Sequence, residues 1–286
     1  MLYDVQGPRA RRRTLIGSVV GTAVLLLLLL VVARRLAEKG QFEPELYEAF
    51  LNEPLLWKRL GEGLRNTLTA AGYGLVLATV VGVVLAFGRL SSLGVFRAPA
   101  ITVIEFFRAT PLLLLIFAFF LATPIVLGIR IQPLWALVLG LTLYNGAVIA
   151  EIIRAGILSL PKGQTEAALA VGLTRGQTLR TVLLPQAVRI MLPSLISQLI
   201  VLLKDTSLGF IIGFEELLRV GGQLRQFLNN PIQIYIVIAL IYIVINLLLG
   251  RLAIYVEGRQ RRLGPGAPDS TQGEMGVVTP AAGATH

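Results

Sequence analysis

Six long apolar runs limit what this chain can fold into more than any other feature of its sequence. A helix needs about 20 mostly apolar residues to cross about 30 Å of hydrocarbon. Runs of this kind occur at residues 15–33, 64–87, 99–121, 134–155, 193–212 and 232–254. The first run is too long, and is followed by too many others, to be a cleaved secretory signal. The fold class is therefore predicted to be an all-α polytopic membrane protein with six transmembrane helices.

Basic residues indicate how these helices are oriented. Arginines gather at residues 9–13, before the first predicted helix, and at residues 259–262, after the last. Lys and Arg are retained on the cytoplasmic side of a membrane protein. An even number of helices puts both termini on one side, so both are predicted to be cytoplasmic. The net charge of +10 has the same origin on this view, and no nucleic-acid partner is expected.

The charge pattern and the apolar runs together divide the chain into segments. We expect a basic cytoplasmic N-terminus at 1–14, a transmembrane helix at 15–33, an external segment at 34–60, a membrane core at 61–258 with a cytoplasmic loop at 159–185, and a tail at 259–286. The bases of the external segment are offset by its glutamates. The tail is rich in Gly, Pro, Ala, Ser and Thr, and we expect it to be disordered.

Several kinds of chemistry lack the residues that they need. The chain has no cysteine, and its single histidine, His286, is the last residue, so neither disulfides nor a metal site are expected. No G-x-x-x-x-G-K-[ST] phosphate loop occurs, so a nucleotide would have to bind another subunit. The chain is therefore predicted to be neither an enzyme nor a cofactor-binding protein.

The cytoplasmic loop carries clear signals for two short helices. The first is predicted at about 164–171 and ends at Gly172, which can take the left-handed cap conformation. Thr174 and Gln177 have the spacing of a capping box and predict the start of the second helix. Small side chains, those of Ala167, Ala168 and Ala170, are expected around the surface of the first helix. Because they let another protein approach closely, we interpret this helix as a docking element.

The same loop resembles the EAA signature of bacterial ABC importer permeases. Glu166-Ala167-Ala168 is followed at the family spacing by Gly172 and by Leu184-Pro185, with Val182 where the family usually has Ile. The segments FRATPLL from Phe107, YNGAVIAEIIRAGILSLPKGQ from Tyr144 and LLKDTSLGFIIG from Leu202 are similar to the polar amino-acid subgroup. The resemblance covers about 57–257 and leaves out the first predicted helix and the tail.

The resemblance implies a function and a set of partners. Five helices would form a type I importer core, and the helix at 15–33 would be an addition to it. Glu166, Ala167, Ala168 and Gly172 would couple the chain to an ABC ATPase dimer, which holds the ATP and Mg. The other implied partners are a second permease copy or a sister permease, an extracytoplasmic binding protein and a polar amino acid. The implied location is the bacterial cytoplasmic (inner) membrane.

Polar residues near the middle of three predicted helices are candidates for the substrate path. They are Thr110, Asn145, Lys204, Asp205, Thr206 and Ser207. Ionisable groups at this depth are costly and are therefore usually functional or paired. Because Asp205, Thr206 and Ser207 are N-cap residue types, we expect the helix to be interrupted there and to aim N–H groups at an anionic ligand. Two structural alternatives remain: a neutralising Lys204–Asp205 pair, and an interhelical hydrogen bond from Asn145.

Other polar features of these helices have a structural interpretation. Pro111 removes a backbone donor and is expected to kink its helix. Glu105 with Arg108, and Glu151 with Arg154, are pairs of opposite charge at i,i+3 spacing, and we interpret both pairs as structural.

Glutamate is the expected cargo, because Lys204 and a reopened helix N-terminus both favour carboxylates. An ion-coupled secondary transporter is the alternative function, although the chain shows no convincing internal repeat. An intramembrane hydrolase is a third hypothesis, for which Ser207 and Lys204 are the nearby candidates.

Overall fold

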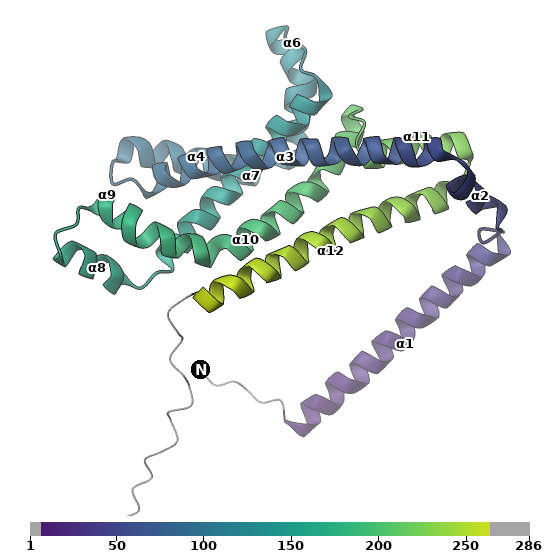
Figure 1. Cartoon of the computed structure of the whole chain (residues 1–286), viewed down its shortest axis with the longest axis horizontal. Helices are drawn as coiled ribbons and strands as arrows, with labels where there is room; N and C mark the ends of the chain where they lie inside the picture. The colour runs from purple at the N-terminus through teal and green to yellow at the C-terminus, as the bar shows by residue number, and fades with distance from the viewer. Residues whose placement is uncertain (1–6, 264–286) are drawn as a thin grey trace, which may run out of the picture. The chain divides into compact units, whose positions relative to one another are not determined.

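The computed structural model describes residues 7–263, and within that range every regular element is helical. In chain order the elements are α1 Pro8–Glu38, α2 Glu45–Asn52, α3 Pro54–Leu90, α4 Gly94–Ala109, α5 Leu112–Phe117, η1 Ala118–Ala122, α6 Thr123–Leu127, α7 Pro133–Leu158, α8 Lys162–Ala170, α9 Arg175–Gln177, η2 Thr178–Leu183, α10 Leu184–Asp205, η3 Thr206–Ile212, α11 Leu217–Leu228 and α12 Pro231–Leu263 (Figure 1). Of these, η1 and η2 are π-helices and η3 is a 3-10 helix.

Up to six segments of the described chain are long and apolar enough to cross a membrane. Five are single helical segments, at Arg9–Glu38, Pro54–Leu90, Pro133–Leu158, Arg175–Ile212 and Pro231–Tyr255. The sixth is a pair of helices, Gly94–Ala109 and Leu112–Leu127, bent by 101° where they meet. The predicted all-α polytopic membrane fold is confirmed, and its third predicted helix is a bent one.

The outer helices are longer than the apolar runs alone suggested. α1 begins at Pro8, so residues 8–14 of the predicted N-terminal segment 1–14 are helical. α12 continues to Leu263, so the first residues of the predicted tail 259–286 are helical as well. The helices extend because the flanking arginines are good helix formers. Residues 1–6 and 264–286, which include His286 and the rest of the predicted tail, lie outside the described residues.

The chain forms two compact units, of which one contains residues up to Asn66 together with Glu215–Leu240. Its short helices are joined by side-chain bonds to backbone oxygens. Asn230 Nδ2 donates to Leu46 O at 2.8 Å, and Asn66 Nδ2 donates to Glu215 O at 2.8 Å. The most apolar 18-residue stretch of α1 has none of its residues buried. An unburied helix that is apolar on every side suits contact with lipid.

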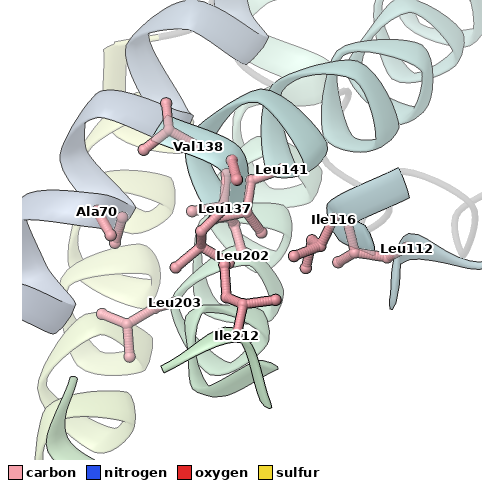
Figure 2. Packing of buried hydrophobic residues seen from close by; sticks show 11 residues of the cluster. Ala70, Leu112, Ile116, Leu137, Val138, Leu141, Leu202, Leu203 and Ile212 are labelled. Atoms are coloured by element: carbon pink, nitrogen blue, oxygen red, sulfur yellow. The ribbon is translucent and has the colours of Figure 1, made fainter. Parts of the chain in front are cut away.

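The other unit, residues 67–214 and 241–263 of the described chain, holds the two main apolar clusters. One cluster joins α3, α5, α7, α10 and η3, and Figure 2 shows Ile116, Leu137, Leu202 and Ile212 meeting in it. The second cluster joins α3, α4, α7 and α10. In both, α7 is the central helix, and about two thirds of its most apolar stretch is buried. The unit is therefore built around α7.

Close helix contacts at glycines hold α3 against α7. A Cβ atom at Gly82 would lie 2.7 Å from Ile149 Cγ2, and one at Gly146 would lie 2.9 Å from Val81 Cγ1. Small residues let membrane helices approach this closely, where dispersion forces replace the hydrophobic effect. The register of α3 on α7 is fixed by these contacts.

Candidate functional site

The turn after α8 has the geometry that the sequence predicted. Gly172 adopts φ +88°, in the left-handed region. Leu173 N donates to Ala168 O at 3.1 Å, and Gly172 N donates to Leu169 O at 3.0 Å. These two bonds make a Schellman motif, which satisfies carbonyls that the helix end would otherwise leave free. α8 therefore ends in a rigid turn.

The predicted capping box is present at the start of the next helix. Thr174 Oγ1 accepts a bond from Gln177 N at 3.3 Å, and Gln177 Oε1 accepts one from Thr174 N at 2.9 Å. We call α8, the Gly172 turn and α9 the coupling elbow; Figure 1 shows α8 and α9 folded back beside each other. The two signals that defined the elbow in the sequence also define it in the structure.

The second helix of the elbow is longer than predicted. Helix continues from Arg175 through η2 and α10 to Ile212, so no separate loop precedes the fifth transmembrane helix. Pro185 is the second residue of α10 and has no N–H to donate to Thr181 O, and its ring crowds that carbonyl. The chain accommodates the proline by widening into the π-helical segment η2.

Only part of α8 is available to a partner. Glu166, Ala167 and Ala170 are exposed, as is Val171 at 78%. Ala168 is only 5% exposed, so the expectation that all three alanines lie on the surface is wrong for this one. The reason is that the turn folds α8 onto η2, and each of these two segments contributes a buried residue there. Ala168 belongs to the inside of the elbow.

The predicted kink at Pro111 is a full break between α4 and α5. Thr110 has an extended backbone and closes α4, because its N–H and its hydroxyl both donate to Phe106 O, at 3.0 and 2.8 Å. Pro111 then begins the next helix in a direction that differs by about 101°. The interruption of a membrane helix that the sequence placed at Asp205 lies here instead.

Asn145 is fully buried in α7 and uses both ends of its side chain within the chain. Its Nδ2 donates to Leu141 O at 2.9 Å, and its Oδ1 accepts from Gln198 Nε2 of α10 at 2.6 Å. The structural alternative, an interhelical hydrogen bond, is the one observed, although Asn145 is the acceptor in it. Gln198 was not singled out in the sequence.

The segment Lys204–Ser207 does not restart a helix. Asp205 keeps helical backbone angles and makes no side-chain cap, because Thr206 N already bonds to Leu202 O and Lys204 O. The buried Thr206 hydroxyl donates to Leu203 O at 2.6 Å. The chain therefore tightens into η3 without exposing N–H groups. The expected helix N-terminus at this point is absent from the described structure.

Lys204 is exposed and forms no salt bridge among the described side chains, although its charge interacts with that of the neighbouring Asp205 at a distance beyond 4 Å. It shares one exposed face of α10 with Ser194, Ser197 and Val201, which follow one another at spacings of three and four residues. We call these four residues the polar face of α10. A lysine inside a membrane helix faces water or another subunit and not lipid.

The candidate substrate-path residues flank one apolar cluster. Leu112 follows the Thr110–Pro111 break, Leu141 lies one turn before Asn145, and Leu203 precedes Lys204; Figure 2 shows all three leucines in the same cluster. The break, the Asn145–Gln198 bond and the polar face thus come from helices that pack together. The serines of the polar face escaped the sequence analysis, although their spacing with Lys204 could have revealed them.

Several candidate membrane helices, a two-helix elbow between two of them and a polar face within one helix are features of a membrane permease. In the described range no group of three His, Asp or Glu side chains could hold a metal ion. Residues 78–262 match the family described as binding-protein-dependent transport system inner membrane component. The chain belongs to this family of multi-pass inner-membrane permeases, in which ATP is bound and hydrolysed by a separate ABC ATPase.

Individual relatives narrow the class to amino-acid permeases. The chain is 44% identical to the glutamate transport system permease protein GluD of Corynebacterium glutamicum, over 80% of this chain and 84% of that protein. It is 36% identical to the glutamine transport system permease protein GlnP of Escherichia coli K12, over 71% and 93%. A crystal structure of an amino acid ABC transporter with histidines matches with a TM-score of 0.70 and 32% identity, over 73% and 98%. The chain is an ABC importer permease for polar amino acids.

Proposed function

We propose that this chain carries glutamate across the bacterial cytoplasmic membrane and that an ABC ATPase dimer drives it through the coupling elbow. The observation that carries the choice of cargo is Lys204, an exposed cation on the polar face of α10 that forms no salt bridge among the described side chains. The 44% identity to a protein named for glutamate transport supports the same choice.

Lys204 favours an anionic cargo for a simple electrostatic reason. A carboxylate that leaves water loses its hydration, and a nearby ammonium group compensates in a site where the effective dielectric constant is low. Ser194 on the same face could donate a hydrogen bond to it, and Ser197 could do so by giving up the bond that its hydroxyl donates to Pro193 O. Glutamate has one carboxylate more than most amino acids, so it gains most from such a face.

The polar face also suggests how the permease assembles. An exposed lysine and two serines in a membrane helix are stable only if a second permease copy, or a sister permease, covers them and encloses the path. Cargo would be delivered by an extracytoplasmic binding protein, with both chain termini on the opposite, cytoplasmic side. The substrate path would then lie between the two permeases.

The elbow is suited to receive the ATPase. Its Schellman turn and capping box fix the angle between α8 and the following helix, so a push on α8 moves that helix as a body. Ala167 and Ala170 leave room for close approach, and Val171 adds apolar area. Glu166 and Gly172 complete the proposed contact. ATP-driven closure of the ATPase dimer, which holds the ATP and Mg, would thus switch the path between its two openings.

The cargo assignment can be tested in vesicles that contain the permease, its ATPase and its binding protein. Lys204→Met should lower glutamate uptake by about 10- to 100-fold, because this factor corresponds to the free energy of one hydrogen bond to a charged group. Assembly with the ATPase should not change. Lys204→Arg keeps the charge and should retain most of the uptake, whereas Lys39→Met, which removes the same charge from an exposed turn between α1 and α2, should have no effect. Wild-type uptake by the Lys204→Met variant would refute the role of Lys204.

A further inference from the structure

Five charged side chains from three helices meet at the end of α3. Arg89 Nη1 lies 2.7 Å from Glu151 Oε1 of α7 and 3.1 Å from Glu105 Oε1 of α4. Arg154 lies 3.0 Å from Glu151, and Arg108 lies 3.9 Å from Glu105, each within one helix. We call these five residues the arginine–glutamate cluster. It includes both pairs that the sequence suggested, together with an arginine that it did not.

Arg89 is the centre of this cluster. In the part of the chain that the structure describes, every ion pair of the cluster that joins different helices involves Arg89. Its side chain and that of Glu151 are each only 17% exposed, whereas Glu105 is 56% exposed. A guanidinium can hold two carboxylates at once because it presents several N–H donors in one plane. Arg89 therefore ties α4 and α7 to the end of α3.

The two glutamates occupy mechanically important places. Glu105 lies about one turn before Ala109, where α4 ends at the Thr110–Pro111 break. Glu151 lies about two turns before Leu158, where α7 ends and the chain enters the coupling elbow (Figure 1). Arg89 thus connects the helix that leads to the elbow with the helix that leads to the break.

Tight packing around Arg89 makes this connection stiff. A Cβ at Gly88 would lie 3.0 Å from the Cβ of Ala100 in α4, and one at Gly82 would lie 2.7 Å from Cγ2 of Ile149 in α7. Packed interiors transmit small displacements because they cannot absorb them. A shift of α7 would therefore reach α4 through Arg89 instead of being lost between the helices.

We propose that Arg89 is a positioning residue that transmits movement of the coupling elbow to the Thr110–Pro111 break. This inference rests on the proposed coupling of the elbow to the ATPase. Loss of Arg89 does not leave a buried carboxylate alone, because Glu151 keeps the Nε and Nη2 contacts of Arg154, at 3.1 and 3.0 Å. The fold should therefore survive the substitution, while the link between helices is lost.

A distance measurement on the whole transporter tests the proposal without knowledge of the cargo. The chain has no cysteine, so spin labels can be placed at Lys162→Cys at the start of α8, away from the proposed ATPase contact, and at Ile125→Cys on α6, both exposed, the second at 84%. With ATP trapped on the ATPase, the distance distribution between the labels should change in the wild-type background. Arg89→Met should abolish that change, and Arg89→Lys, which can pair with one carboxylate at a time, should restore part of it.

Arg97→Met is the matched control, because Arg97 is exposed and makes no ion pair within residues 7–263. This variant should respond to ATP as the wild type does. Transport in vesicles should give the same answer. Amino-acid uptake per ATP hydrolysed should fall at least about fivefold in Arg89→Met, because about fivefold is the smallest effect that coupled sites usually have on each other. It should not fall in Arg97→Met.

The outcomes distinguish the role of Arg89 from the role of the coupling elbow. An ATP-dependent distance change that persists in Arg89→Met would overturn the role of Arg89 and leave the elbow assignment standing. A wild-type distance that ATP does not change would overturn the coupling role of the elbow, and the role of Arg89 with it. Equal loss of assembly with the ATPase in Arg89→Met and Arg89→Lys would show a purely structural arginine and would also refute the proposal.

Discussion

Gln198 of α10 donates a 2.6 Å hydrogen bond to the side-chain oxygen of Asn145 in α7. Asn145 is fully buried, and its Nδ2 donates to Leu141 O one turn earlier. The side-chain amide of Asn145 thus links α7 and α10, which have the most extensive helix–helix contact in the unit of residues 67–214 and 241–263. Its role is to fix α10, and with it the polar face, in a defined rotation on α7.

Gln198→Leu should lower the stability of the permease because it leaves the oxygen of Asn145 buried without a donor. The expected loss is about 1 kcal/mol, within the range of interhelical hydrogen bonds in membrane proteins. The apparent melting temperature of the detergent-solubilised protein measures it. Ser197→Ala is the control, because the Ser197 hydroxyl bonds only to Pro193 O of its own helix. Equal melting temperatures for the two variants would refute the importance of the Asn145–Gln198 bond.

Gly172→Ala should loosen the coupling elbow, since an alanine at φ +88° is strained by about 1–2 kcal/mol. Trypsin cleavage at Arg175 should become about five times faster as the elbow opens more often. Gly176→Ala provides the comparison, because Gly176 lies in α9 without a positive φ and with nothing within 4 Å of its would-be Cβ. The strained-turn interpretation fails if both variants are cleaved at the wild-type rate.

Features set by nearby residues could be predicted from the sequence. The Gly172 turn and the Thr174–Gln177 capping box each depend on residues within one or two turns, and both are found as expected. The same holds for the number of membrane helices, because length and hydropathy are properties of single segments. The family signature in the loop added the functional interpretation.

Features set by distant packing could not be predicted. Spacing revealed the Glu151–Arg154 pair but not Arg89, which belongs to another helix and completes the cluster. Ala168 looked like its two neighbouring alanines until the elbow folded it onto η2. The N-cap residue types at Asp205 predicted a restart, yet the carbonyl of Leu202 was within reach of Thr206 N and the helix simply tightened.

Ala167→Asp should prevent docking of the ATPase, because it places a charge on the exposed face of α8 where a close apolar contact is proposed. Copurification of the ATPase should fall at least about tenfold, as expected for a desolvated, unpaired charge. Thr174→Asp adds the same charge to the elbow but keeps a good N-cap acceptor, so it should leave copurification nearly unchanged. Normal copurification and uptake by Ala167→Asp would show that α8 is not the docking element.

The proposed coupling requires that the elbow lies on the cytoplasmic side of the membrane, so the orientation of the chain must be tested. Because the chain contains no cysteine, single cysteines can be introduced at the exposed positions Glu48, Lys162 and Arg225, which lie between membrane helices, and at the exposed Arg97 in the first turn of α4. A membrane-impermeant maleimide should label positions 48 and 225 in intact cells, and positions 97 and 162 only after the membrane is permeabilised. The reason is that Lys and Arg stay on the cytoplasmic side and that successive helices alternate in direction. Labelling of position 162 in intact cells would place the elbow outside the cell, where no ATPase could reach it.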